Sequence, residues 1–369
     1  MIQKVAIIGV GLIGGSLSLS LKKHQKNLEI TGFDRAEALD EALKRKAIDY
    51  PASSLEDAVR DADLVIIAVP IAKILLLTEE MAPYLKPGAI VSDVGSVKKP
   101  VVEHAEKVLP SSVTFIGGHP MAGSEKSGVR NADPFLFENA TYVLCPPSNI
   151  PEDTFATEFS EFIDLISTIG ARIYVLPADR HDRIAAAVSH LPQLLAVTLM
   201  NYVADYHEED EAFLQLAAGG FRDMTRIASS SFEMWRDIVV ANEGPILDML
   251  GGFATSLQKM RNRVFSNDLK DLNETFEKAR IHRDLIPKHS KGFLSPLADV
   301  YVYAEDKPGF LYKLIGVLHE AEIDIKDLEL LKIREGIEGV FRIGFSNQSR
   351  AAKAIAALEK AGYTAFELK

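Results

Sequence analysis

A histidine in a glycine-rich stretch is the residue of this chain best suited to acid–base chemistry. His119 follows the apolar run 113–116 and stands between Gly117-Gly118 and Pro120. A neutral imidazole can accept the proton of an alcohol near pH 7 while a hydride leaves the same carbon. This pattern favours a catalytic role for His119. The alternative is a loop histidine that hydrogen-bonds to backbone.

Two other side chains could act on the same hydroxyl group. Ser96 follows another apolar run, 89–92, and could share the hydroxyl's hydrogen bond. Its alternative is an ordinary turn serine after Gly95. Glu125 comes shortly after His119 and could orient it or bind substrate, but a plain solvated carboxylate would have the same pattern.

The stretch 184–204 contains no Asp, Glu, Lys or Arg, yet it carries several polar side chains. Ser189 and Gln193 are four residues apart and share a helix face, with His190 turned about 100° away. Polar groups in so apolar a helix need partners or a ligand, and they would be costly in lipid. We therefore expect a helix buried inside the protein at a subunit interface, and no membrane partner.

Two arginines further along could bind a carboxylate. Arg222 and Arg226 are four residues apart, and a guanidinium fork matches the geometry of a carboxylate. The structural alternative, a salt bridge to Asp223 or Asp237, is the more common arrangement for such arginines.

The first 34 residues predict a dinucleotide site. Gly9 allows a tight turn after the run 5–8, Gly11 lets the backbone approach a pyrophosphate, and Gly14 lets helix and strand pack closely. Asp34 follows a second apolar strand and would accept the ribose hydroxyls of NAD, which favours NAD over NADP. Arg35 argues the other way. The predicted cofactor-binding residues are Gly9, Gly11, Leu12, Ile13, Gly14, Asp34, Arg35, Val69, Pro70 and Ser96.

These residues require a sheet to position them. Apolar runs at 5–8, 28–33, 64–69, 89–92 and 113–116 alternate with helical patterns, which predicts a doubly wound α/β sheet of the Rossmann type over residues 1–176. Ligands bind beyond the carboxyl ends of such strands. The polar loops after Pro70, Asp93 and Ile116 should therefore carry the chemistry. Strands at 141–145 and 171–176, around a helix at 153–169, complete this domain.

Two further domains are expected after residue 176. Residues 177–285 show only helical patterns, with Pro192 kinking the uncharged helix, and their apolar content suggests a dimerisation domain. Helices over 208–217 and 223–228 are among those expected there. Residues 286–298 have linker composition. The order βαββαβ over residues 299–369 predicts a ferredoxin-like α+β module.

Composition narrows the class of protein. A chain of 369 residues is long enough for two or three domains. A net charge of −11 argues against a nucleic-acid or anionic-membrane partner, so an anionic substrate must be attracted by local cations. Cys145 is the only cysteine, which leaves no disulfide framework and no thiolate metal site and fits a cytoplasmic protein. The chain enters a core strand at once, so we expect no signal peptide.

Together the motifs resemble one family. The glycine motif with Asp34 is followed in order by 93-DVGSVK-98, 118-GHPMAGSE-125, 189-SHLP-192, 220-GFRDMTR-226 and 234-MWRD-237. Residues 1–290 closely resemble prephenate dehydrogenase of the tyrosine pathway. Residues 299–369, with 306-DKPG-309, resemble an ACT domain, a module that commonly binds an amino acid as regulator.

The resemblance implies oxidative decarboxylation of prephenate with NAD, giving 4-hydroxyphenylpyruvate, CO2 and NADH. In the family, the residue matching His119 accepts a hydrogen bond from the ring hydroxyl beside the match of Ser96. The match of Arg226 binds a substrate carboxylate, and the match of Trp235 reaches in from the partner subunit. The remaining pocket residues implied by the resemblance are Glu125, Ser189, His190 and Asp223. Gln193 replaces a histidine of some relatives, so its contacts with the substrate stay open, and Lys99 replaces a common glycine.

Other readings remain at this point. The substrate could be arogenate, with an amino group where prephenate has a keto group. Another hydroxyacid dehydrogenase would explain the first domain but not the ACT-like tail. A ligand-sensing regulator is disfavoured by the intact Asp34, Ser96, His119 and Arg226. For the tail, end-product logic suggests tyrosine as effector, whereas ferredoxin-like modules also serve as dimer contacts. The effector residues expected are Asp306, Pro308, Gly309, Leu311 and Asp324.

Overall fold

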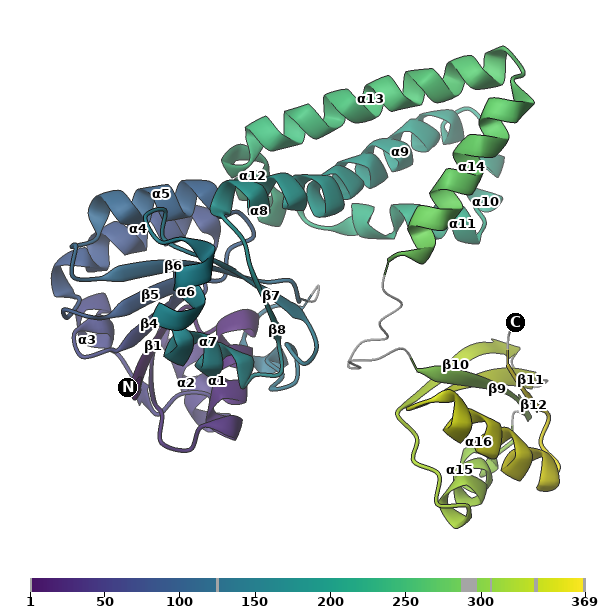
Figure 1. The fold of residues 1–369 in the computed structure, drawn as a ribbon, viewed down its shortest axis with the longest axis horizontal. Coiled ribbons are helices and arrows are strands. Elements are labelled where there is room, and N and C mark those ends of the chain that lie inside the picture. Colours follow the sequence, from purple (N-terminus) through teal and green to yellow (C-terminus); the bar gives the residue numbers. More distant parts are fainter. Residues whose placement is uncertain (1, 124–125, 287–296, 306, 335–337, 368–369) are drawn as a thin grey trace. The chain divides into compact units, whose positions relative to one another are not determined.

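The computed structural model describes residues 2–123, 126–286, 297–305, 307–334 and 338–367 (Figure 1). The chain forms two compact units, Met1–Phe276 and Glu277–Lys369. Two predicted site residues, Glu125 and Asp306, lie outside the described residues, as do residues 287–296 of the expected linker.

The described part of the first unit contains an eight-stranded sheet of order β3-β2-β1-β4-β5-β6-β7-β8. Because β1 lies between β2 and β4, the strand order reverses there, which is where doubly wound sheets bind dinucleotides. All neighbouring strands are parallel except β6 and β7, which are antiparallel. The strands are β1 (Lys4–Ile8), β2 (Glu29–Phe33), β3 (Tyr50–Pro51), β4 (Leu64–Ile67), β5 (Ile90–Asp93), β6 (Thr114–Pro120), β7 (Thr141–Cys145) and β8 (Arg172–Val175).

Both faces of the sheet are covered, because successive residues of a strand point to opposite sides. Val5 and Ile7 of β1 belong to one apolar core, and Ala6 and Ile8 belong to the other. Helices α1 (Leu12–His24), α2 (Ala36–Lys44), α6 (Glu152–Glu158) and α7 (Ser160–Ser167) contribute to the first core. Helices α3 (Leu55–Val59), α4 (Ile71–Met81) and α5 (Lys99–Val108) contribute to the second. Two short 3-10 turns, η1 (Ala82–Tyr84) and η2 (Val129–Asn131), lie in the connections.

Strand β6 is longer than the sequence predicts, and this places His119 inside a strand. We expected the strand to end at Ile116 and to open into a loop, but β6 continues to Pro120, with His119 opposite Val143 of β7. The glycines that suggested a loop serve close packing instead. A Cβ on Gly118 would stand 2.3 Å from the backbone oxygen of Asp93. The expectation that His119 lies on a loop is therefore wrong.

The described residues in the rest of the first unit are helical. In the first long helix of this region, the hydrogen bonding changes from α-helical to π-helical just before Pro192. Residues 186–190 form a π-helical segment, η3 (Ala186–His190), and Pro192 stands in the first turn of the next helix. Because proline lacks an N–H, the helix must rearrange before it. The elements are α8 (Ala178–Ala185), η3, α9 (Leu191–His207), α10 (Ala212–Gln215), α11 (Gly219–Thr225), the 3-10 helix η4 (Arg226–Ser229), α12 (Phe232–Ala241), α13 (Glu243–Phe265) and α14 (Leu269–Asp284), which continues past the end of the unit at Phe276.

Three helix boundaries differ from the prediction. The helix expected over 153–169 is divided into α6 and α7 at Phe159, whose backbone leaves the helical region with φ −109° and ψ 26°. The helix expected over 208–217 is only the short α10, because α9 extends to His207. The helix expected over 223–228 begins earlier, at Gly219.

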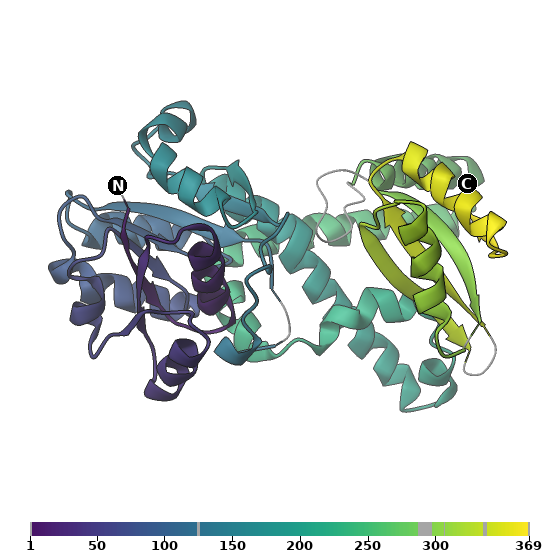
Figure 2. The same ribbon diagram turned by 90° about the horizontal axis from the view of Figure 1, so that it is seen from below.

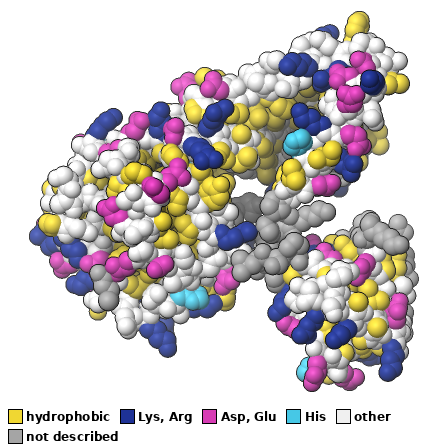
Figure 3. All heavy atoms as spheres, in the orientation of Figure 1, with side chains coloured by type: hydrophobic (Ala, Val, Ile, Leu, Met, Phe, Trp, Pro, Cys, Tyr) yellow, Lys and Arg dark blue, Asp and Glu magenta, His cyan; other side chains and the backbone are white. Residues whose placement is uncertain are grey.

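The helical region leaves much apolar surface uncovered within a single chain (Figure 3). Residues 178–207 are long and apolar enough to cross a membrane by length and composition alone, and 28% of the most apolar stretch is buried. The expectation of a helix buried inside the protein is therefore met only in part by the chain itself. The exposed large side chains include Tyr202, Leu216, Phe232, Val240, Leu257 and Phe265.

The second unit has the element order βαββαβ predicted for the tail. Its four-stranded antiparallel sheet has the order β10-β11-β9-β12 in the described residues. Helices α15 and α16 pack on one face of this sheet around their own apolar core (Figure 2). The elements are β9 (Ala298–Glu305), α15 (Phe310–Glu320), β10 (Asp327–Arg334), β11 (Glu338–Phe345), α16 (Gln348–Lys360) and β12 (Ala365–Phe366).

Candidate active site

The glycine loop after β1 has the shape that a dinucleotide requires. Gly9 has φ +97°, and a Cβ there would stand 2.4 Å from the backbone oxygen of Ala68. A Cβ on Gly14 would stand 2.1 Å from the backbone oxygen of Gly9, so helix α1 and the loop touch through glycine alone. Beside Gly11, in contrast, a Cβ would meet none of the described atoms within 4 Å. The loop therefore leaves open space at the position predicted to face a pyrophosphate.

Asp34 closes this loop at the end of β2. Its carboxylate accepts hydrogen bonds from the backbone N–H of Val10 at 2.8 Å and of Arg35 at 2.7 Å. The carboxylate is thus held beside the glycine loop, where ribose hydroxyls could donate to its remaining lone pairs. The side chain of Val69 also lies against Gly9, and Pro70 begins helix α4. The predicted cofactor residues therefore gather at one edge of the sheet.

A fully buried ion pair holds the strand ends beside this loop. Lys98 and Asp93 both have 0% exposure and form a salt bridge. The ammonium of Lys98 also donates to the backbone oxygen of Gly118 at 2.7 Å, and the carboxylate of Asp93 accepts from the backbone N–H of Gly118 at 3.0 Å. The two peptide groups on either side of Gly118 are therefore fixed, and with them the residue that follows, His119. Half-buried Ser96 lies in the loop between Asp93 and Lys98.

His119 is linked to a second histidine and a carboxylate. Its Nδ1 lies 2.8 Å from Nε2 of His181, and Nδ1 of His181 lies 2.8 Å from Oδ1 of Asp182. Burial lowers the pKa of His119 well below its ordinary value. Repulsion by the ammonium of Lys98, and by His181 and His190 whenever they are protonated, lowers it further. His119 is therefore neutral at physiological pH and can accept a proton.

A third histidine belongs to the same network. The side-chain amide of Asn242 donates to the backbone oxygen of Asp182 at 2.9 Å and contacts Nδ1 of His190 at 3.1 Å. Burial lowers the pKa of His190 to about 4, so this imidazole also stays neutral. Trp235 stands edge-on to His190, with ring centroids 5.9 Å apart. The resemblance implied a tryptophan reaching in from a partner subunit, whereas this contact is within one chain.

Gln193 connects this cluster to the arginine segment. One turn beyond His190, its amide donates to the backbone oxygen of Ile227 at 3.0 Å, which holds η4 against α9. Arg226 is exposed, and among the described residues its guanidinium has no hydrogen-bond or ion-pair partner. Asp237, one expected salt-bridge partner, pairs with Arg236 instead. The guanidinium of Arg226 is thus available to an anion.

Two predicted substrate residues make no recorded side-chain contact with this cluster. Asp223 is exposed on α11, and Ser189 is half-buried in η3 beside His190. Ser189 shares the π-helical turn of His190, so the backbone alone places it near the site. The structure therefore brings His119, His190 and Gln193 into one region and leaves Asp223 at its surface.

Sequence reasoning missed the residues that connect these groups, namely Lys98, His181, Asp182 and Asn242. The pair His181-Asp182 stands in the charged run 179-DRHDR-183, which has the composition of a solvated helix. Yet His181 is 3% exposed and Asp182 is 2% exposed. A signal was available only in the spacing, because both belong to the one buried stripe of α8, together with Ala185.

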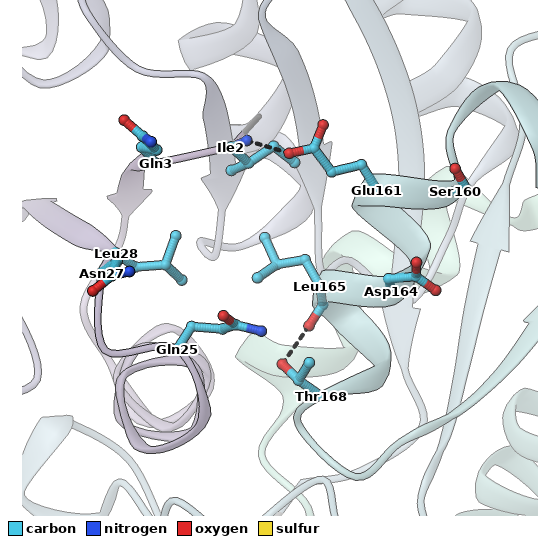
Figure 4. A pocket seen from close by; sticks show the side chains of 10 residues that line it. All are labelled: Ile2, Gln3, Gln25, Asn27, Leu28, Ser160, Glu161, Asp164, Leu165 and Thr168. Atoms are coloured by element: carbon cyan, nitrogen blue, oxygen red, sulfur yellow. Dashed lines mark hydrogen bonds between the residues drawn. The ribbon is translucent and has the colours of Figure 1, made fainter.

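One pocket of the first unit lies elsewhere and is not this site. A pocket of about 440 Å³ is lined by residues just before β1 and β2 and by α7, including Gln3, Gln25 and Glu161 (Figure 4). It is therefore at the amino ends of the strands, whereas doubly wound sheets bind ligands at the carboxyl ends. No group of three His, Cys, Asp or Glu side chains in the described residues could hold a metal ion.

Comparison with known proteins agrees with this geometry. Residues 17–175 match the model of the prephenate dehydrogenase nucleotide-binding domain, and residues 177–278 match that of the prephenate dehydrogenase dimerization domain. A prephenate dehydrogenase of Bacillus subtilis is 38% identical over 99% of this chain and 98% of its own. The chain belongs to the prephenate dehydrogenase family.

Two solved members of the wider group show the same architecture. The A. aeolicus prephenate dehydrogenase, in complex with hydroxyphenyl propionate and NAD+, is 30% identical with a TM-score of 0.71, covering 78% of this chain and 99% of that one. The Synechocystis arogenate dehydrogenase is 28% identical with a TM-score of 0.68, covering 76% and 99%. Since the matches to the two family domains end at residue 278, the βαββαβ elements of the second unit lie beyond them.

Substitution by alanine should affect stability at Gly14 and NAD binding at Gly11. Gly14→Ala places a methyl group against the backbone oxygen of Gly9 and should lower the melting temperature, because backbone there cannot yield. Gly11→Ala meets open space and should leave the melting temperature unchanged while weakening NAD binding about tenfold or more. Thermal unfolding and NAD titration of both variants check this. Normal NAD binding by the Gly11→Ala variant would show that the pyrophosphate does not bind beside Gly11.

Proposed function

We propose that this chain catalyses the NAD-dependent oxidative decarboxylation of prephenate to 4-hydroxyphenylpyruvate, with release of CO2 and NADH, as a step of tyrosine biosynthesis. Family membership and the cofactor loop support the reaction class. The observation that carries the assignment is the neutral imidazole of His119, linked to His181 at the carboxyl edge of the sheet that also carries the glycine loop.

The residues divide the work as follows. When bound, NAD supplies the hydride acceptor for the ring carbon that bears the hydroxyl. His119 accepts the hydroxyl proton, with Ser96 on the neighbouring loop as a second hydrogen-bond partner. Arg226 binds a carboxylate of the substrate through its guanidinium. Loss of the ring carboxylate as CO2 makes the ring aromatic, so the step is irreversible.

Asp34 selects the cofactor. A carboxylate at the end of β2 accepts hydrogen bonds from ribose hydroxyls and repels a 2′-phosphate, so NAD is preferred over NADP. Exposed Arg35 would moderate this preference. Arogenate is the second candidate substrate, because the Synechocystis relative is an arogenate dehydrogenase. NADH or NADPH formation from each substrate with each cofactor decides between them, and no turnover of either substrate would overturn the proposal.

His119→Asn should lower kcat by about 100-fold or more, because the amide cannot take the hydroxyl proton. Because the pKa of His119 is held below its ordinary value by burial and by His181, Lys98 and His190, kcat/KM should stay level as pH falls through 6.5. It should decline only at more acidic pH, where the imidazole becomes charged. Steady-state rates from pH 5 to 9 measure this. A wild-type kcat in this variant would show that His119 does not accept the hydroxyl proton.

Arg226→Ala should raise KM for prephenate about 10- to 100-fold with a smaller change in kcat, since a charged hydrogen bond to the substrate is lost. Arg222→Ala is the matched control, because it removes the same charge from an exposed residue one turn earlier. Equal KM values for the two variants would contradict a specific carboxylate site at Arg226.

The uncovered apolar surface of the helical region supports a homodimer. Side chains as large as Tyr202 and Phe232 are more than half exposed in the single chain. A patch of this kind usually marks an interface, and the matched family domain is described as a dimerization domain. His190 and Gln193 of the long apolar helix are turned inward and buried, which argues for a protein partner over lipid.

The second unit is proposed as an ACT domain that binds tyrosine. A pocket of about 450 Å³ is lined by residues from the end of β9, the start of α15 and the segment before β12, including Pro308 and Lys313. Gly309, with φ +84°, begins α15 beside it, and exposed Leu311 is on the same helix. Asp324 lies beyond the other end of α15 and pairs with Lys326, so one ligand would meet both sets only between two copies.

Tyrosine should inhibit the full chain and should inhibit a chain ending at residue 298 at least tenfold less. Thr364→Trp should have the same effect, because Thr364 is exposed and lines the pocket. Thr364→Ser is the control and should leave inhibition unchanged. Inhibition curves with tyrosine give the measurement. Equal inhibition of the shortened and full chains would place the effector elsewhere.

A further inference from the structure

Two histidines of the site, half-buried His119 and buried His190, are linked to the same residue by different atoms. His119 reaches the carboxylate of Asp182 through His181. His190 reaches the backbone oxygen of Asp182 through the amide of Asn242. We propose that His181 and Asn242 are positioning residues that impose opposite tautomers, holding His119 as a proton acceptor and His190 as a hydrogen-bond donor. The proposal rests on the role of His119 given above.

The first half follows from the partners of Asp182. Its Oδ1 accepts the backbone N–H of Lys98 at 2.7 Å and its Oδ2 accepts that of Lys99 at 2.8 Å. Both carboxylate oxygens are therefore acceptors, and the contact of Oδ1 with Nδ1 of His181 is completed when that nitrogen carries the proton. The proposal takes His181 as a ring with this one proton, which leaves a lone pair on Nε2.

That lone pair determines the state of His119. Nε2 of His181 and Nδ1 of His119 are 2.8 Å apart, a hydrogen-bond distance that requires one proton between them. The proton must then belong to Nδ1 of His119. Nε2 of His119 is left with its lone pair, and among the described residues it has no hydrogen-bond partner. This is the nitrogen that can take the hydroxyl proton, while Asp182 stabilises the positive charge that then forms, as in other imidazole–carboxylate pairs.

The second half follows from the amide of Asn242. The amide nitrogen can only donate, and it offers one proton to the backbone oxygen of Asp182 and the other to Nδ1 of His190. Nδ1 of His190 is therefore an acceptor. Since His190 is neutral at physiological pH, its single ring proton is on Nε2. His190 presents a permanent donor, suited to an oxygen of an anionic substrate.

The two tautomers suit two different groups of one substrate molecule. A hydroxyl group that loses its proton needs an acceptor, and a carboxylate or keto oxygen needs a donor. Free imidazoles would exchange between both states, and part of the enzyme would then be in a non-productive form. A merely structural Asp182 would tie α8 to the start of α5 without any effect on the imidazole protons, and this is the alternative that the experiment must exclude.

The direct test is 15N NMR of the histidine-labelled full chain at pH 7.5, because protonated and unprotonated ring nitrogens differ widely in chemical shift. His119→Asn and His190→Asn assign the two rings by loss of their signals. We expect His119 with the proton on Nδ1 and His190 with the proton on Nε2. Either ring in the opposite tautomer, or a mixture of both tautomers, would overturn the proposal.

Variants at the two positioning residues test the cause. His181→Phe should lower kcat about 10- to 100-fold, leave KM for prephenate within about twofold and shift the His119 proton towards Nε2. His181→Gln keeps an oxygen that can accept from His119, so it should restore the Nδ1 proton and most of kcat. Asn242→Ala should remove the fixed Nε2 proton of His190 and mainly raise KM. Equal losses for Phe and Gln at position 181, without a change of tautomer, would overturn the proposal.

His104→Phe controls for the loss of a half-buried histidine with one backbone hydrogen bond, and it should retain wild-type kcat. Failure of this inference is distinguishable from failure of the proposed function. If the tautomers are as expected but the full chain turns over neither prephenate nor arogenate, the proposed function fails and the tautomer assignment stands. If His119→Asn is inactive and the tautomers are reversed, the inference fails and the proposed function stands.

Discussion

The buried ion pair between Lys98 and Asp93 is the interaction on which the geometry of the site depends. Two charges without solvent exposure carry a large desolvation cost, and hydrogen bonds to Gly95 and Gly118 offset part of it. These hydrogen bonds join Asp93 at the end of β5, and its partner Lys98, to the two peptide groups on either side of Gly118 in β6. Strand β6 can therefore continue to Pro120 with His119 in a defined orientation.

The same region explains how a chain of net charge −11 can attract an anionic substrate. The positive charges of the site are local. Buried Lys98 bonds to the backbone of Gly118, and exposed Arg226 at the start of η4 has no hydrogen-bond or ion-pair partner among the described residues. Asp93 and Asp182, the nearby carboxylates, are both buried and occupied by donors. The buried negative groups thus act on the protein's own backbone and imidazoles. Lys98 is paired with Asp93, so the guanidinium of Arg226 is the group that remains for a ligand. The overall field of the protein decides little at this distance.

The helical region serves two purposes with one helix. Its inward face carries His190 and Gln193, which are buried and hydrogen-bonded, and its outer face leaves large apolar side chains uncovered. The π-helical segment before Pro192 lets both occur, because the extra residue in the turn rotates the helix between Ala185 and Leu191. One helical stretch, 178–207, therefore carries both the buried polar residues and part of the exposed apolar surface.

Much of this protein is determined by local sequence. The glycine spacing with Asp34 predicts the cofactor loop, because a tight turn, a close approach and a dense helix–strand contact each need glycine at a fixed place. Apolar periodicity predicts the strands, most helices and the βαββαβ order of the second unit, since burial of one face depends on neighbours in the chain. The prediction that His119 accepts a proton follows from residue type and position, whereas the proposed role of Arg226 depends on the resemblance of the whole motif set to one family.

Only the tertiary structure decided which polar residues are buried together. His181 and Asp182 look like solvated helix residues in the sequence, and Asn242 looks like a helix end, yet all three meet around His119 and His190. Gly117 and Gly118 look like a loop, yet they let β6 pass close to Asp93. The physical reason is the same in each case. Contacts between residues distant in the chain depend on packing, and packing leaves no periodic trace around a single buried polar side chain.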